Sequence, residues 1–432
     1  MKEILIDSSK LNSWLNARKF TIDNFFQNKK NLKKKLKNKD YFHCNYKDVE
    51  FITKKLNIDT KEIIKVKQVP EYILWNKKFI ESTKRPIKRD GIHFYNYYSL
   101  PSPDNFKSPV ILDILCPKTK IPKLNNGHLE QAITVVLGPG DIYGRWGKKK
   151  KSSNFKKINI NKEKITNWIV GDTYLEPTYL PHTYSLASNT PSKILSYTAK
   201  SPIEKFIRNF NNWSKKSYVN FSKKISNKNI LETIFKEILN ERFVDLKYLK
   251  QLLGIKKINI KTIVNNRKYL EKICNLFDID QSLFIKKNYK EDDVGKTYMS
   301  IKESTKLKRK YKNYEIAPMA SSIRYPDLYG TFIKVYKNIS KTNLLNIFNC
   351  HYLVTSGQLF FITNKKKLIV SEGDCLWVSP YINHGFSGKG SLIRISNGES
   401  LDNQDLNEIS NLYKPKQTLT RSYGDKQVWG YE

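Results

Sequence analysis

The pattern of apolar and polar residues divides the chain into two helical and two strand-rich stretches. Apolar residues at spacings of three and four predict short amphipathic helices over 10–64 and again over 202–284. Between them, over 91–198, segments rich in β-branched and aromatic residues alternate with Gly and Pro clusters. They include PVILDILC, AITVVLG and KILSYTA, and they predict antiparallel strands. Strand-like segments return after Asp292, with GTFIKVY, HYLVTSGQLFFIT and KGSLIRIS, and the last residues, KPKQTLTRSYGDKQVWGYE, predict an extended tail.

This order of elements indicates an internal duplication. The tetrapeptide ESTK occurs at 81–84 and at 303–306, and GDTYLEPTYLPH from Gly171 aligns without gaps with GDCLWVSPYINH from Gly373. We therefore predict an α+β fold, a duplicated unit of a small helix-turn-helix-like bundle plus a cupin-type antiparallel β-barrel. The expected domains are a helical domain (1–75), a first barrel (76–201), a second helical domain (202–290), a second barrel (291–410) and a C-terminal tail (411–432).

Two imidazoles and one carboxylate stand out in the first strand-rich stretch. They are His128 in NNGHLEQ, and Glu176 and His182 in GDTYLEPTYLPH. Two histidines and one carboxylate with open positions are typical of a non-haem Fe(II) that binds substrate and O₂. A single histidine is more often structural, but a carboxylate among apolar and aromatic neighbours is costly to bury, and a metal relieves that cost. The pattern therefore favours a metal site.

The second copy of the repeat lacks part of this set. Both His128 and His351 come just before an apolar strand, and we take them as equivalent; His384 aligns with His182. Val378, however, stands where the first copy has Glu176. We predict that the second barrel is degenerate and structural.

A basic and aromatic segment, KRPIKRDGIHFYNYYSLPSP, precedes the candidate metal ligands. It holds Lys88, Arg89, Asn96 and three tyrosines. Arginine supplies a planar fork of donors, and tyrosine and asparagine add neutral ones, so the segment suits an oxyanion pocket. The alternative is an aromatic-rich strand with a basic turn.

Composition narrows the class of protein. No run of about 18 apolar residues predicts a membrane helix, and the N-terminus lacks the features of a signal peptide. Five scattered cysteines without a CxxC pair predict reduced thiols and a cytoplasmic protein. The net charge of +38 is spread over the chain, so we favour solvated surface over nucleic-acid binding, with a field that attracts small anions. A homo-oligomer is compatible with the sequence.

Long motifs in this order resemble the hydroxyethylphosphonate dioxygenase and methylphosphonate synthase family of non-haem iron enzymes, which pair helical and cupin domains. The motifs are NARKF, RPIKRDGIHFYNYYSL, PVILDILCP, NNGHLEQAITVVLGPGDIYGRWG, GDTYLEPTYLPHTYSLA, ILSYTA, DDVGKT and the final WGYE. The resemblance covers nearly the whole chain.

The resemblance implies residue roles. The iron ligands fall on His128, Glu176 and His182. The phosphonate-binding groups fall on Arg89, Tyr97, Asn125 and Ser196, and a lysine from the helical domain on Lys19. It implies Fe(II), with O₂ as co-substrate, and cleavage of 2-hydroxyethylphosphonate to hydroxymethylphosphonate and formate. The substrate would supply all four electrons, without 2-oxoglutarate.

Two alternatives stay open. A methylphosphonate synthase converts the same substrate to methylphosphonate and carbon dioxide, and in that branch a glutamine four residues after the first histidine is the third ligand. Here that position is Ala132, Glu176 is present, and strand alternation is expected to turn the adjacent Gln131 away from His128. A transcription regulator, from a different class, would need a basic recognition helix that contacts bases. The resemblance instead assigns Lys19, in the first bundle, to the active site.

Overall fold

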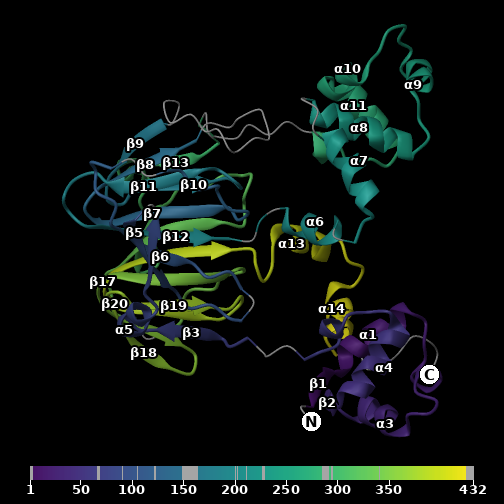
Figure 1. Cartoon of the computed structure of the whole chain (residues 1–432), viewed down its shortest axis with the longest axis horizontal. Coiled ribbons are helices and arrows are strands. Elements are labelled where there is room, and N and C mark those ends of the chain that lie inside the picture. The colour runs from purple at the N-terminus through teal and green to yellow at the C-terminus, as the bar shows by residue number, and fades with distance from the viewer. Residues whose placement is uncertain are drawn as a thin grey trace.

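The computed structural model describes residues 3–65, 69–89, 91–104, 106–120, 123–147, 164–199, 201, 203–210, 212–225, 229–284, 291–292, 295–339 and 341–424. Two β units are stacked on one side of the molecule, and two helical units lie on the other side (Figure 1). The predicted α+β fold with its repeated order of elements is confirmed. None of the described helices has the length and apolar content needed to cross a bilayer.

The first helical unit packs around a core that includes Leu11, Leu15, Phe25 and Ile52. Polar side chains cap the N-termini of three of its helices. It also contains a two-stranded antiparallel sheet that the helical pattern did not predict, because strands of four residues show little alternation. Its elements are β1 (Ile4–Asp7), α1 (Ser8–Ala17), α2 (Ile22–Phe25), α3 (Lys30–Asn38), β2 (Tyr41–Cys44), α4 (Tyr46–Leu56) and η1 (Thr60–Glu62).

The second helical unit has its own core around Phe235, Leu249 and Ile273. Gly254 ends α9 in the left-handed conformation, as glycine after a helix commonly does. The elements are α6 (Glu204–Phe210), α7 (Lys215–Ile225), α8 (Ile230–Glu241), α9 (Leu246–Leu253), α10 (Ile260–Asn265), α11 (Arg267–Leu276) and η3 (Gln281–Phe284).

The predicted extended tail is wrong for its described part. The last described elements are α13 (Asn403–Ser410) and α14 (Pro415–Gly424), and α14 packs against α1. The final WGYE lies outside the described residues.

The first β unit consists of a seven-stranded and a three-stranded antiparallel sheet that face each other across one core. That core includes Leu112, Trp146, Trp168, Tyr174 and Ile194. The sheets are ordered β13-β10-β7-β12-β6-β5-β4 and β11-β8-β9. The strands are β4 (Arg85–Arg89), β5 (Ile92–Ser99), β6 (Val110–Ile114), β7 (Ala132–Pro139), β8 (Ile142–Trp146), β9 (Lys164–Trp168), β10 (Thr173–Glu176), β11 (His182–Leu186) and β12 (Ser192–Thr198).

The second β unit is an antiparallel sheet ordered β14-β15-β16-β20-β17-β19-β3, with β18 paired to β17. Its interior is filled by apolar side chains such as Leu359, Phe361 and Phe386. The strands are β14 (Arg309–Tyr311), β15 (Tyr314–Pro318), β16 (Tyr329–Val335), β17 (Asn349–Thr363), β18 (Lys367–Ser371), β19 (Cys375–Val378) and β20 (His384–Asn397).

Each half of the chain gives one strand to the other half. Strand β3 (Tyr72–Trp75) pairs with β19 of the second unit, and β13 (Thr297–Met299) pairs with β10 of the first. The helices that follow, α5 (Lys77–Ser82) and α12 (Ile301–Lys306), contain much of the two ESTK repeats. Asp172 accepts a hydrogen bond from the Ile301 backbone N–H at 2.9 Å, and Asp374 accepts one from that of Lys77 at 2.8 Å. The repeated Gly-Asp turns therefore bind the start of a helix from the opposite half.

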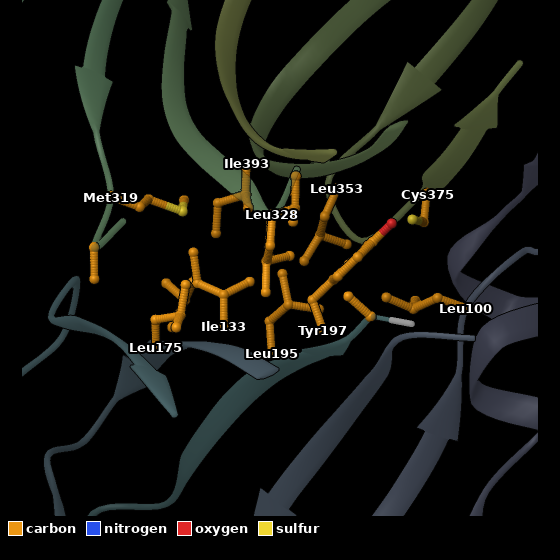
Figure 2. Packing of buried hydrophobic residues seen from close by; sticks show 14 of the residues in the cluster. Leu100, Ile133, Leu175, Leu195, Tyr197, Met319, Leu328, Leu353, Cys375 and Ile393 are labelled. Atoms are coloured by element: carbon orange, nitrogen blue, oxygen red, sulfur yellow. The ribbon is translucent and has the colours of Figure 1, made fainter. Parts of the chain in front are cut away.

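A second apolar core joins the two β units (Figure 2). Alternation along β7 directs Ile133 and Val135 into this shared core, so Ala132 and Thr134 face the interior of the first unit. Other members are Leu175, Leu195, Tyr197, Met319, Leu328, Leu353, Cys375 and Ile393. We propose the five predicted residue ranges as domains, with the exchanged strands crossing between them.

Candidate active site

His128, Glu176 and His182 converge at one edge of the first β unit. One ligand atom from each lies within 4.8 Å of the others. Glu176 ends β10 and lies directly opposite Ala132 at the start of β7, while His182 begins β11 opposite Trp146. Strand register thus places three side chains from three distant parts of the chain together.

The two histidines present the same nitrogen to the carboxylate. His128 Nδ1 lies 2.6 Å from the Glu130 carbonyl oxygen and His182 Nδ1 lies 2.8 Å from that of Leu180, so each Nδ1 donates to a backbone carbonyl. Each Nε2 is then left with a lone pair. These Nε2 atoms lie 3.1 Å (His128) and 3.7 Å (His182) from Glu176 Oε1. Metal-binding histidines usually have one ring nitrogen fixed in this way.

The electrostatics of the cluster also fit a cation. Burial of Glu176 would raise its pKa, but the neighbouring His182 and His128 outweigh this and the pKa is lowered. Burial would lower the pKa of His128, but the hydrogen bond and charge of Glu176 raise it. Glu176 is 1% exposed, and its Oε2 has no hydrogen-bond partner within the described part of the chain. Two imidazole lone pairs and a buried carboxylate with one unsatisfied oxygen are a donor set that fits a divalent transition metal.

Asn125 forms hydrogen bonds with His182. Its Oδ1 accepts hydrogen bonds from the backbone N–H of His182 and of Gly127, both at 2.9 Å. Its Nδ2 lies 3.1 Å from His182 Nε2, at the edge of the cluster. A cation bound to that Nε2 would free the amide N–H to donate to another ligand.

Comparison with known proteins places the chain in a family. Residues 81–199 match the model of the 2-hydroxyethylphosphonate dioxygenase cupin-like domain. A 2-hydroxyethylphosphonate dioxygenase from Streptomyces viridochromogenes is 35% identical over 363 residues, which are 82% of each chain. The chain belongs to the 2-hydroxyethylphosphonate dioxygenase family.

Solved structures agree with this assignment. The structure of PhpD with cadmium complexed with hydroxyethylphosphonate is 30% identical, has a TM-score of 0.81 and covers 96% of this chain and 99% of its own. The Streptomyces albus enzyme with substrate and Fe(II) has a TM-score of 0.78 at 12% identity, covers 98% of each chain and supports the fold alone. The family's fold therefore extends over nearly the whole chain.

Three further residues assigned to phosphonate binding, Ser196, Tyr97 and Arg89, lie on strands of the first β unit. Ser196 is half-buried on the interior face of β12, between Thr134 and Val110 of the neighbouring strands. Tyr97 is half-buried and packs against the interior core of the first unit. The backbone of Arg89 ends β4, but its side chain is outside the described residues. The roles of these residues in binding stay predictions.

Lys19 is not brought to the cluster within the chain. It follows the end of α1 in a left-handed conformation, with φ 59°, and is exposed. The first helical unit lies well apart from β8, β10 and β11 (Figure 1). Its predicted contact with substrate stays a prediction.

Sequence reasoning missed two residues that support the cluster. Trp146 is fully buried and packs against Trp168 at a centroid distance of 5.3 Å. Lys296, from the DDVGKT motif, is 3% exposed, forms an ion pair with Asp292 at 2.5 Å, and holds its Nζ 4.5 Å from the centroid of the Trp146 ring. The DDVGKT motif was visible in the sequence. Its contact with Trp146, which lies opposite His182, follows only from the pairing of β13 with β10 in the other half of the chain.

The predicted equivalence of His351 and His128 is wrong. Val378 lies opposite Cys350, as Glu176 lies opposite Ala132, so the counterpart of His128 is Asn346. The backbone contacts agree, because Tyr179 N–H donates to the His128 carbonyl at 2.7 Å and Tyr381 N–H donates to that of Asn346 at 2.8 Å. The second unit therefore lacks two of the three ligands, and only His384 remains.

His351 instead lies between the β units. Its Nε2 donates to the Pro101 carbonyl at 2.6 Å, and its Nδ1 accepts from the Tyr197 hydroxyl at 3.0 Å. Burial lowers the pKa of His351 to about 3, and that of His384 to about 4. Both are therefore neutral in the folded protein near neutral pH.

This predicts loss of stability in acid. The unfolded chain takes up protons at these histidines below about pH 6.5, while the folded chain does not until pH 3 to 4. The stabilisation is complete above pH 6.5 and falls as the pH decreases. At pH 5 each histidine should lower the free energy of unfolding by roughly 2 kcal/mol relative to neutral pH. Urea unfolding at pH 7 and 5 should show a smaller loss for His351→Gln than for the unchanged protein; equal losses would contradict the assignment.

Proposed function

We propose that the chain is an Fe(II)- and O₂-dependent dioxygenase that cleaves 2-hydroxyethylphosphonate to hydroxymethylphosphonate and formate. The observation that carries the proposal is the convergence of His128, Glu176 and His182 within 4.8 Å in a member of this family. The curated relative is named for this dioxygenase activity, and PhpD is described with hydroxyethylphosphonate bound. Five free, buried cysteines further support a reducing compartment, and we propose the cytoplasm.

The three ligands would hold the iron through the two Nε2 atoms and the Glu176 carboxylate. Bound iron supplies a Lewis acid and a redox centre that couples substrate oxidation to O₂. Two histidines and one carboxylate leave positions free for the substrate and for O₂. The reaction balances without another reductant, because substrate plus O₂ contain the atoms of hydroxymethylphosphonate and formic acid.

The chain's other residues would bind and orient the phosphonate. Ser196 and Tyr97 offer neutral donors from the interior of the first unit, and Arg89 would add a cationic fork. Asn125 Nδ2 already lies beside His182 Nε2, so it could donate to a phosphonate oxygen at the cluster. Buried aromatic side chains behind the ligands, among them Trp146 and Tyr174, exclude water from that side.

Methylphosphonate synthase remains the second candidate, and two observations favour the dioxygenase over it. Ala132, where that branch has glutamine, is buried directly opposite Glu176 and offers no ligand. Gln131 lines a cavity of about 150 Å³ with Ala199, Arg324 and Leu328, on the side of the shared core. This position supports the prediction that Gln131 faces away from the ligands.

Product analysis distinguishes the two activities. The protein would be loaded anaerobically with Fe(II), mixed with 2-hydroxyethylphosphonate and O₂, and followed by phosphorus NMR. We expect hydroxymethylphosphonate together with formate. Methylphosphonate as the phosphorus product would reassign the chain to the second candidate, and an unchanged spectrum would exclude both.

Replacing Ala132 with glutamine tests the register between β7 and β10. The longer side chain would enter filled space beside Glu176, so we expect a stability loss of about 1–3 kcal/mol and lower turnover. In Ala132→Gln/Glu176→Ala the amide has room, and iron binding should recover relative to Glu176→Ala alone. Iron content and urea unfolding of the three variants measure this. No recovery in the double variant would mean that position 132 does not reach the metal.

A further inference from the structure

Arg394 faces the interior of the second β unit. On β20 it lies between Tyr352 of β17 and Thr331 of β16, while its neighbours Ile393 and Ile395 enter the core shared by the two units. Alternation therefore directs the guanidinium into the second interior. Most of the other side chains that fill this interior are apolar or aromatic.

Neutral groups surround the guanidinium. Arg394 Nη2 donates to Asn346 Oδ1 at 2.7 Å, and Asn346 Nδ2 donates to the Tyr352 hydroxyl at 2.9 Å. The Tyr352 hydroxyl in turn donates to His384 Nε2 at 2.8 Å, since His384 Nδ1 donates to the Ile382 carbonyl. The network fixes one edge of Arg394 and uses only part of its five N–H donors.

No carboxylate forms an ion pair with Arg394 in the described part of the chain. The ionisable groups with the largest effects on Arg394 are Tyr352, Cys350 and Tyr329. A partly buried cation without a counter-ion is costly, and binding an anion would offset that cost. Val378, which replaces the carboxylate of Glu176, also removes the negative charge that would repel an anion.

The repeat assigns the same place to Arg394 and Ser196. Ser196 lies opposite Thr134, and Arg394 lies opposite Tyr352, in the matching positions of the two units. Both are half-buried although they face inward. Each residue therefore keeps part of its surface open to solvent, and we infer from this that a small ligand has access to Arg394.

We propose that the second β unit binds a small oxyanion at Arg394 without a metal. The planar fork suits two oxygens of a carboxylate or of a phosphate-type group. This site would persist whether or not the first unit has the proposed dioxygenase activity, because it shares no residue with the candidate iron ligands.

The test uses the metal-free full-length protein and isothermal titration with inorganic phosphate and, separately, with formate. Arg394→Met removes the charge and keeps the bulk of the side chain. Arg394→Lys keeps the charge and loses the fork. We expect at least one of the two oxyanions to bind the unchanged protein more tightly than it binds Arg394→Met. Its affinity for Arg394→Lys should be about tenfold lower than for the unchanged protein. The matched control Arg324→Met removes an arginine paired with Glu291 at 3.1 Å and should bind like the unchanged protein.

The outcomes separate the ligand classes. Binding of phosphate alone assigns a phosphate or phosphonate site, and binding of formate as well assigns a general carboxylate and phosphate site. Equal binding by the unchanged protein and both Arg394 variants would overturn the proposal. So would equal binding of chloride at the same ionic strength, because the fork would then not be recognising an oxyanion. If Arg394→Met does not fold, the comparison with Arg394→Lys decides.

Discussion

Replacing Glu176 with alanine is expected to abolish iron binding and turnover. The carboxylate is the only anionic ligand in the cluster, and its Oε1 lies 3.1 Å from His128 Nε2 and 3.7 Å from His182 Nε2. Loss of a group that merely orients a metal ligand costs up to about 100-fold in affinity, so loss of the ligand itself should cost more. Iron content after anaerobic loading and phosphorus NMR of the products measure the two effects.

His384→Ala is the matched control for His182. The two residues occupy equivalent positions, and both fix Nδ1 on a backbone carbonyl. His182→Ala should lose iron, as Glu176→Ala does. His384→Ala should keep iron and turnover and lose about 2–4 kcal/mol of stability, since it leaves a cavity and removes the acceptor of the Tyr352 hydroxyl. Iron loss in both histidine variants to the same extent would contradict a single metal site in the first unit.

The sequence predicted the long strands well, and the three side chains that it singled out as ligands lie close together. Segments such as those that form β7, β12 and β17 carry enough alternation to be recognised, and the unpaired carboxylate among apolar residues indicated a metal. The same alternation predicted that Gln131 faces away from His128. These features depend on local periodicity, which a single sequence contains.

Features that depend on pairing could not be predicted. The GDTYLEPTYLPH repeat aligns without gaps, but the segments before β7 and β17 share no motif, so His351 was matched to His128 by its place before a strand. Only the register identifies Asn346 as the counterpart. The exchanged strands β3 and β13 have four and three residues, too few for a recognisable pattern, and their partners belong to the other half.

Because β13 from the second half of the chain packs beside β10, we expect a large loss of stability when Asp172 is replaced. Asp172 precedes β10 and is 2% exposed. It accepts hydrogen bonds from the Ile301 N–H at 2.9 Å, the Tyr298 hydroxyl at 3.0 Å and the Ile169 N–H at 3.2 Å. Asp172→Ala leaves these donors without their acceptor, which should cost about 3–5 kcal/mol. Because β13 borders β10, iron affinity should fall as well. Urea unfolding and iron content would be measured on the same samples.

Asp374→Ala supplies the matched control in the other half. Asp374 is only half-buried and accepts from the Lys77 and Ser371 N–H groups, both at 2.8 Å, so water can replace part of its role. We expect a stability loss of about 1–2 kcal/mol, typical of a lost helix cap, and normal iron content. The two turns are alike in sequence, so we attribute the larger stability loss in Asp172→Ala to the deeper burial of Asp172. Equal stability losses in the two variants would contradict this. Lower iron content in Asp374→Ala would mean that β3, far from the ligands in the fold, also positions them.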